Sequence, residues 1–353
     1  MSPSDISGLM TRVLRRAAHP CRILVAGALL GIGLPSGCAY SSANRAPIPQ
    51  HELQPFVAEM VRDHGFSRPQ LDALFAKARI LPGVLAAMQR PAEALPWYRY
   101  RAIFLTPSRI QGGAVFWDRY ADILQRAQQR YGVPPQIVTG IIGVETRYGS
   151  HVGTIPVLDS LTTLAFDYPP RSAFFRSELA QFLLLTRDNH LDPLAIKGSY
   201  AGAMGMPQFI SSSYRRYAVD FDGDGRRDLL NSPADAIGSV ANYLNAHGWT
   251  AGAPVAVRVR VSGDRYQDLL KNNDPTPRYT LAELSNFGVV AADPAPQDQP
   301  VALLRLKGPQ GDEYWAGFHN FYVITRYNHS ALYAMAVFQL SREIRAARDR
   351  RNP

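Results

Sequence analysis

Residues 141–149 read Ile-Ile-Gly-Val-Glu-Thr-Arg-Tyr-Gly. One ionisable side chain, that of Glu145, closes an apolar run of helical spacing that begins after Pro134-Pro135. On a helix Glu145 shares its face with Val138 and Ile141. We therefore expect a desolvated carboxylate, and desolvation raises a carboxyl pKa toward the range of a general acid. The competing interpretation is a buried structural glutamate paired with an arginine such as Arg147 or Arg171.

Composition indicates a globular protein with a sizeable core. The chain has 353 residues, of which 46% are hydrophobic and 19% are charged, enough for two or three domains. The net charge of +9 raises the question of nucleic acid. Lysines are few and the arginines are scattered, so we expect no nucleic-acid partner, while an anionic polymer remains compatible with the charge.

The amino terminus has the pattern of an export signal. Four arginines precede the apolar run 23–34, which is too short to span a bilayer comfortably. The following Leu34-Pro35-Ser36-Gly37-Cys38 resembles a bacterial lipobox, which predicts a signal peptide over residues 1–38 and lipidation of Cys38. Pro35 stands where Leu is usual, so the alternative is cleavage between about Ala39 and Ala43 and release as a soluble protein.

Both cysteines, Cys21 and Cys38, lie in this segment. The mature chain therefore has no pair from which to build a disulfide or a thiolate metal site.

The remaining pattern is mainly helical with a small β part. Short amphipathic helices are expected from about residue 51 to 94, and one longer helix from Phe116 to Tyr131, stopped by Gly132. Alternating valines at 255–261 and the run 303–306 predict strands. Ser330 is a candidate N-cap for a last helix with an arginine-rich end.

A second notable stretch is residues 198–209, Gly-Ser-Tyr-Ala-Gly-Ala-Met-Gly-Met-Pro-Gln-Phe. Its small residues allow a backbone to approach a ligand closely, and Ser199 and Gln208 bracket them. A nucleotide loop is disfavoured because neither glycine-rich phosphate-binding pattern is present. The remaining alternative is a tight helix-packing seam.

Together these stretches resemble the lytic murein transglycosylase B family, periplasmic enzymes that cleave the glycan strands of peptidoglycan. The resemblance runs from about Tyr98 to Gln339. It is carried by the two stretches above and by residues 98–101, 132–135, 235–243 and 323–328. It implies a lysozyme-like α core at 111–251 and 313–348, an N-terminal helical domain at 48–110, and an inserted small β domain at 252–312.

The same resemblance implies the roles of single residues. Glu145 would be the sole catalytic acid/base. Ser199 and Asn328 match positions that touch the reaction region. The positions that match the lining of the glycan groove are Tyr100, Arg171, Gln208, Tyr243 and Tyr327. Each also has a structural reading, since Tyr243 and Tyr327 suit a core whose hydroxyls are satisfied.

One carboxylate suffices if the substrate supplies the nucleophile: the muramic O6 hydroxyl attacks its own anomeric carbon and leaves a 1,6-anhydromuramoyl end. Two other functions compete with this one. A muramidase hydrolase needs a second carboxylate, for which Asp159 and Asp167 are nearest in sequence. A non-catalytic wall-binding scaffold would not need Glu145 or Asn328, and both are present.

The third pattern is acidic. Asp220, Asp222 and Asp224 alternate before Gly225 as in the opening of an EF-hand-like calcium loop, but the twelfth position is Asn231. The resemblance suggests that the Arg226 carbonyl and Asp235 complete a structural calcium site, with Asp228 as the competing last ligand. The alternative is a solvated acidic turn, and no organic cofactor is expected.

The chain departs from the family where members carry two adjacent arginines after Tyr-Pro, since it has Pro170-Arg171. This puts in doubt how tightly the peptide stem is held on that side. We expect a periplasmic monomer, lipid-anchored to the outer membrane or else soluble, acting on peptidoglycan alongside other cell-wall enzymes.

Overall fold

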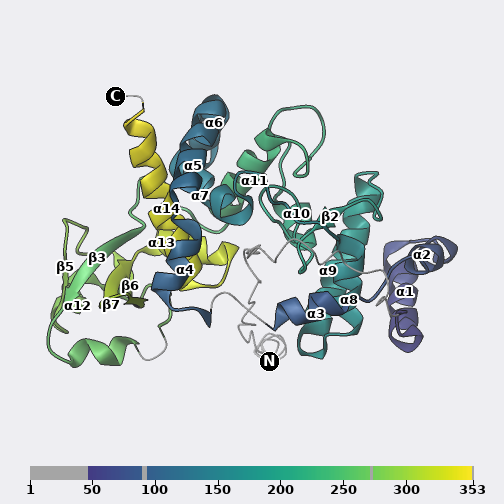
Figure 1. Cartoon of the computed structure of the whole chain (residues 1–353), viewed down its shortest axis with the longest axis horizontal. Helices are drawn as coiled ribbons and strands as arrows, with labels where there is room; N and C mark the ends of the chain where they lie inside the picture. The colour runs from purple at the N-terminus through teal and green to yellow at the C-terminus, as the bar shows by residue number, and fades with distance from the viewer. Residues whose placement is uncertain (1–46, 90–93, 271–272, 352–353) are drawn as a thin grey trace, which may run out of the picture.

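The computed structural model describes residues 47–89, 94–270 and 273–351. The predicted signal peptide at 1–38 and Cys38 lie outside the described residues. The described chain is mainly helical with a small β part, as the sequence predicts (Figure 1). Within it, no helix combines the length and the apolar character needed to cross a membrane.

The N-terminal half is helical. Its elements are α1 (Gln50–His64), α2 (Arg68–Phe75), α3 (Pro82–Met88), α4 (Trp97–Phe104), α5 (Pro107–Arg119), α6 (Ala121–Tyr131), α7 (Pro135–Thr146), α8 (Val157–Phe166), η3 (Pro169–Arg171) and α9 (Ser172–Asp188). Two short strands, β1 (Ile155–Pro156) and β2 (Lys197–Gly198), pair antiparallel.

The C-terminal half contains the larger sheet. Its elements are α10 (Ser211–Tyr217), α11 (Pro233–Ala246), β3 (Ala256–Val261), η4 (Arg265–Leu270), β4 (Tyr279–Thr280), α12 (Leu281–Ser285), β5 (Val289–Ala291), β6 (Pro300–Gly308), β7 (Gly311–Gly317), α13 (His319–Tyr327) and α14 (Ala331–Asp349).

The elements form two lobes around the centre of the molecule (Figure 1). On one side, α3 packs on α8, and α8 packs on α9, with α1 and α2 beyond them. On the other side, α14 packs against α4, α5, α7 and α13, with the sheet below. The helical domain predicted at 48–110 is thus divided, because α4 lies with α14 and β6 while α3 lies with α8.

The five-stranded antiparallel sheet has the order β4-β6-β7-β3-β5. The predicted strands correspond to β3 and β6, and in β3 Val259 is buried while Arg258 and Arg260 are exposed. The sheet has a small apolar core of its own that includes Val259, Leu303 and Phe318. The boundary predicted at 312 falls inside β7, because the β6–β7 hairpin continues to Gly317.

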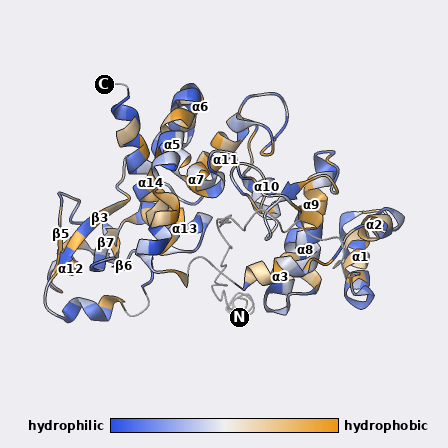
Figure 2. Ribbon diagram, in the orientation of Figure 1, coloured by the Kyte–Doolittle hydropathy of each residue, from blue (hydrophilic) through white to orange (hydrophobic). Residues whose placement is uncertain are grey.

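The helix predicted over Phe116–Tyr131 is wrong in one respect, since it is two helices. Tyr120, with φ −115° and ψ 28°, separates α5 from α6. Each part is apolar enough on one side to pack alone, so the periodicity did not reveal the break. In Figure 2, α6 carries a hydrophobic stripe on an otherwise hydrophilic ribbon. Gly132 ends α6 with φ 73°, as predicted.

Helix α7 is at the centre of its lobe. Gln136 is its one residue outside the buried set, because α5, α6, α11 and α14 pack around it. A helix that is apolar on every side belongs inside a core. Its burial therefore places the residue at its end, Glu145, where these helices meet.

Ile142→Ala should show how much the fold depends on α7. Ile142 is fully buried, so we expect the free energy of unfolding to fall by about 2–5 kcal/mol because a cavity replaces the side chain. Urea denaturation followed by circular dichroism measures this. The control is Val115→Ala, at a side chain 42% exposed, where the change should stay within about 0.5 kcal/mol. Equal losses in both variants would contradict the central role of α7.

Candidate active site

Glu145 lies in the last turn of α7 and is only 6% exposed, as the sequence predicts. The hydroxyl of Tyr333, on α14, donates a hydrogen bond of 2.6 Å to Glu145 Oε1. Burial, followed by the charge of Glu145, raises the pKa of Tyr333 well above its usual value, so the hydroxyl keeps its proton and remains a donor. A short bond to a carboxylate is of the strong, charge-assisted kind and fixes its orientation.

The chain turns sharply just after Glu145. Arg147 and Tyr148 both have left-handed backbone conformations, with φ 48° and 61°, which end α7. The Tyr148 hydroxyl donates to the Arg109 carbonyl at 2.7 Å, and its ring lies so close to Gly143 that a Cβ there would be 2.6 Å from the hydroxyl oxygen. This contact ties the end of α7 to α5.

The stretch 198–209 forms a compact loop of turns and isolated β-bridges beside the end of α7. The helix-packing seam considered for it is therefore wrong. Thr146 donates to the Met206 carbonyl at 2.9 Å, and Tyr327 donates to the Pro207 carbonyl at 2.6 Å. Gly205 has φ 68°, and a Cβ there would lie 2.1 Å from the Leu229 carbonyl oxygen, so no other residue fits without movement.

Ser199 and Gln208 hold the shape of this loop. The Ser199 hydroxyl, on a side chain 2% exposed, accepts hydrogen bonds from the Ala201 and Ala203 N–H groups at 3.2 and 2.9 Å. Gln208 adopts φ 51°, and its amide nitrogen donates to the carbonyls of Val152 and Gly205. Both residues thus have structural contacts, whatever else they touch.

A row of aromatic rings leads away from Glu145. The rings of Tyr333 and Tyr327 are stacked with centroids 6.3 Å apart, and Tyr327 meets Tyr243 edge-on at 4.9 Å. Tyr243 donates to the Arg326 carbonyl at 2.6 Å. Burial, and next the charge of Glu145, raises the pKa of Tyr327 well above its usual value. These hydroxyls are therefore neutral donors.

The other predicted residues occupy different places around this row. Tyr100, on α4, is fully buried and lies near enough to Tyr333 to contribute to its raised pKa. Asn328, directly after α13, is 1% exposed and adjoins Tyr327. Arg171 lies at the start of α9, with its guanidinium 4.3 Å from the Phe174 ring centroid.

The chain is similar to known proteins over most of its length. A family model described as Transglycosylase SLT domain matches residues 49–342. Membrane-bound lytic murein transglycosylase B of Escherichia coli (strain K12) is 47% identical over 305 residues, which cover 84% of this chain and 83% of the relative. The chain belongs to the lytic murein transglycosylase B family.

Solved structures agree with this. Catenated lytic transglycosylase SltB1 from Pseudomonas aeruginosa is 49% identical with a TM-score of 0.80, covering 85% of this chain and 98% of that one. Escherichia coli Slt35 in complex with calcium is 48% identical with a TM-score of 0.78, covering 86% and 95%. Pseudomonas aeruginosa SltB3 in complex with NAG-NAM-pentapeptide is 34% identical with a TM-score of 0.74, covering 84% and 79%.

The protein is therefore a peptidoglycan lytic transglycosylase, a lyase with a lysozyme-like fold, as the resemblance implied. Two contacts of this transglycosylase escaped sequence reasoning. Tyr333 is fully buried on α14, and nothing local in the sequence indicates that its hydroxyl meets Glu145, 188 positions away. Glu178 is 4% exposed and accepts from the Ser212 N–H at 3.0 Å, which caps α10 from α9.

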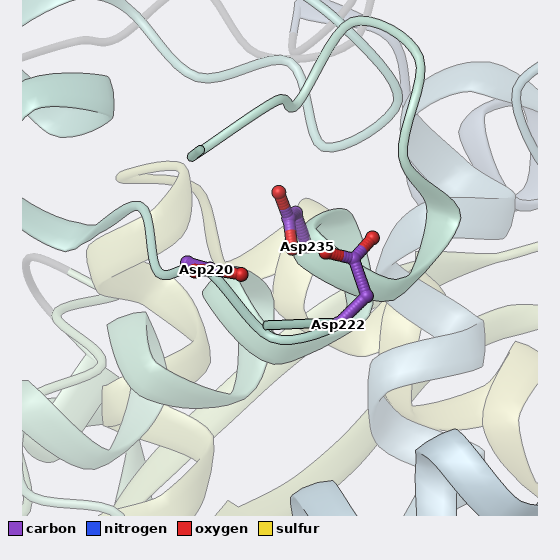
Figure 3. Close-up of side chains that lie close together, drawn as sticks. All are labelled: Asp220, Asp222 and Asp235. Atoms are coloured by element: carbon purple, nitrogen blue, oxygen red, sulfur yellow. The ribbon is translucent and has the colours of Figure 1, made fainter. Parts of the chain in front are cut away.

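The acidic loop of the transglycosylase brings three carboxylates together. Oxygens of Asp220, Asp222 and Asp235 lie within 4.8 Å of one another, two from the loop and one from the first turn of α11 (Figure 3). Asp235 is fully buried and accepts from the Phe221 and Asp228 N–H groups, both at 2.7 Å. Burial is the main cause that raises the pKa of Asp235, and the charge of Asp222 adds to it.

The remaining acidic positions have other contacts. Asp228 Oδ1 accepts from the N–H groups of Leu230 and Asn231, and its Oδ2 accepts from the Asn231 amide. Asp224 Oδ1 accepts from the Arg226 N–H at 2.8 Å and lies outside the group of three. The geometry therefore favours Asp235 over Asp228 as the last carboxylate of a cation site.

Thr146→Val should loosen the loop of residues 198–209 in this transglycosylase. The substitution keeps the shape but removes the hydroxyl that donates to Met206 and accepts from Gly149. We expect a loss of about 1–3 kcal/mol in the free energy of unfolding, because buried partners lose their hydrogen bonds. Thr250→Val, at an exposed threonine, should change it little. An unchanged denaturation midpoint for Thr146→Val would contradict this role.

Proposed function

We propose that Glu145 is the single acid/base of the transglycosylase reaction. The observation that carries the proposal is a buried carboxylate at the end of α7, oriented by the Tyr333 hydroxyl at 2.6 Å. A group that must exchange a proton twice needs a fixed position and little competing water. Both conditions hold at Glu145.

The proposed reaction has two proton transfers. Protonated Glu145 donates to the oxygen that links N-acetylmuramic acid to N-acetylglucosamine, and the bond from that oxygen to the muramic anomeric carbon breaks. Glu145, now a carboxylate, takes the proton of the muramic O6 hydroxyl as O6 bonds to the same carbon. The product is a 1,6-anhydromuramoyl end, no water is consumed, and Glu145 is again protonated. The intramolecular attack benefits from a high effective concentration.

The hydrolase alternative needs a second carboxylate to activate water or to act as nucleophile. Asp159, on α8, instead accepts a hydrogen bond from the Arg79 N–H at 3.0 Å and links α8 to the segment before α3. Asp167 is exposed after the end of α8. Asp159 is as buried as Glu145, but its carboxylate has this structural contact, and Asp167 is exposed, so the transglycosylase mechanism with a substrate nucleophile is favoured.

The glycan is proposed to lie along the aromatic row. Tyr243, Tyr327 and the loop that carries Ser199 and Gln208 would form one wall, and Asn328 adjoins the reacting sugar. Hydroxyls and ring faces suit N-acetylated sugars, which offer both polar groups and apolar faces. Tyr100 and Arg171 complete the predicted set, with Arg171 at the start of α9 on the side of the peptide stem. SltB3, a relative, is described in complex with NAG-NAM-pentapeptide.

Glu145→Gln tests the mechanism. We expect kcat on purified peptidoglycan to fall by about 10²- to 10⁴-fold, because an amide cannot transfer the proton, with the circular dichroism spectrum and glycan binding retained. Mass spectrometry of the products identifies anhydromuramoyl ends, which are lighter than hydrolysed ends by one water. Glu343→Gln, at an exposed position of α14, is the control and should stay active. Substantial turnover by Glu145→Gln would overturn the assignment.

We also propose a structural calcium ion in the acidic loop. Hard carboxylate oxygens suit calcium, and Asp220, Asp222 and Asp235 supply them, with Asp224 and the Arg226 carbonyl as the further predicted ligands. A divalent cation would compensate the charge of Asp235, which burial otherwise disfavours. Its role would be to tie the loop to α11. The relative Slt35 is described in complex with calcium.

Calcium removal should destabilise the protein. A chelator should lower the melting temperature and added calcium should restore it, because an ion that binds only the folded state stabilises it by about 2.7 kcal/mol at 100 times its Kd. Asp235→Asn should abolish this response. Asp293→Asn removes the same charge from an exposed loop and should leave the response intact. A melting curve insensitive to calcium would indicate a solvated acidic turn.

We propose that the protein acts in the periplasm, as a monomer, and that lipidation of Cys38 anchors it to the outer membrane. The supporting observations are the lipobox-like residues 34–38 and the membrane-bound character named for the Escherichia coli relative. Release as a soluble periplasmic protein is the alternative, and SltB1 is described as soluble in one of its structures.

A further inference from the structure

Basic side chains gather where three helices end beside Tyr243. Arg216 lies in the last turn of α10, His247 caps the C-terminus of α11, and Arg326 lies in the last turn of α13. His329 follows α13 by two residues. Helix C-termini attract cations through their dipoles, so the alternative to a binding role is that these residues only complement the negative ends of the helix dipoles.

In the part of the chain that the structure describes, no carboxylate pairs with Arg326. Within the described residues, neither Arg326 nor Arg216 forms an ion pair. The helices α10, α11 and α13 carry one carboxylate between them, Asp235, about 18 Å from His247 along α11 at 1.5 Å per residue. Asp235 is also engaged in the acidic loop.

The Arg326 guanidinium is held in place but incompletely satisfied. It stacks on the Tyr322 ring at 4.2 Å, and one terminal nitrogen donates to the Thr325 hydroxyl at 2.9 Å. Its Nε is buried without a hydrogen-bond partner among the described residues. A fixed, half-buried cation whose charge no ion pair neutralises is a common basis for carboxylate recognition.

The two histidines beside Arg326 are uncharged, and one of them adds a donor. Burial, and then the charge of Arg326, lowers the pKa of His329 to about 4, and the same two causes, in the same order, lower the pKa of His247. The imidazoles are therefore neutral near pH 7. The Nδ1–H of His247 donates to the Tyr243 carbonyl at 2.6 Å, so the Nε2 of His247 carries no proton and only His329 can offer an N–H group to a ligand.

This cluster adjoins the proposed glycan wall. The His247 ring stacks on Tyr243 at 4.1 Å, and Tyr243 donates to the Arg326 carbonyl. Tyr243 in turn meets Tyr327, which stacks on Tyr333, the partner of Glu145. The basic groups therefore adjoin the Tyr243 end of the proposed glycan wall, near the C-terminal ends of α11 and α13. Arg171, by contrast, lies at the start of α9.

We propose that Arg326, with His329, forms an anion subsite beside the His247 ring that binds a free carboxylate of the peptide stem on N-acetylmuramic acid. The inference rests on the proposed function, since it takes the glycan to lie along Tyr243 and Tyr327. The sugar chain itself is neutral, so the stem supplies the carboxylates of this substrate. The subsite selects strands that carry charged stems and strengthens their binding before the bond is cleaved.

The test compares two substrates with one glycan. Peptidoglycan strands are used with native stems and after conversion of their carboxylates to neutral N-methylamides. For Arg326→Gln we expect the KM for native strands to rise about tenfold or more with kcat little changed, because a hydrogen-bonded charge pair is lost. The KM for amidated strands should not change. Arg326→Lys should recover part of the native preference, and Arg345→Gln, an exposed charge on α14, should behave as wild type.

An equal KM rise for both substrates would assign Arg326 a structural role and overturn the subsite, as would a native preference that survives Arg326→Gln. If Arg326→Gln fails to fold, calorimetric titration of the wild-type protein with a muramyl pentapeptide and its amidated form decides: equal affinities overturn the proposal. Failure of the proposed function looks different, because wild-type protein would then release no anhydromuramoyl ends from either substrate.

Discussion

One buried carboxylate constrains the structure around it. Glu145 sits at the end of a helix whose other residues are almost all apolar and buried. A charge in such a place is costly unless a donor meets it, and the hydroxyl of Tyr333 does so from α14. The packing of α14 against α7 therefore fixes the fold and the orientation of Glu145 together. The proposed chemistry depends on this packing, because the same contact that stabilises the fold also orients the carboxylate.

The loop of residues 198–209 shows how the rest of the site is attached to this centre. It has little regular structure of its own, yet Thr146 next to Glu145 and Tyr327 on α13 each bind one of its carbonyls. Glycine at 205 permits a backbone approach to Leu229 that a side chain would block. The small residues in this stretch thus serve close packing of the backbone, and a substrate-binding role is added to a segment already held on two sides.

Charge is distributed unevenly around the site. Acidic groups collect in the loop before α11, where Asp220, Asp222 and Asp235 favour a cation. Basic groups collect at the other end of α11, beside Tyr243, where Arg326 lacks a carboxylate partner within the described chain. One helix therefore connects a region suited to calcium with one suited to a carboxylate. The proposed anion subsite also offers a place to hold the stem besides that expected at Arg171.

The sequence by itself determined the mainly helical class, the strands within β3 and β6, the apolar helix that ends in Glu145, and the family, because these depend on local periodicity and on motifs in order. It did not reveal the break at Tyr120, since both halves share one apolar pattern, or the division of residues 48–110 between two lobes. The pairing of Tyr333 with Glu145 and the gathering of Arg326, His247 and His329 were decided by tertiary structure alone. Their partners are far apart in the chain, and a side chain that lies on an apolar face gives no local signal of which polar group its tip will meet.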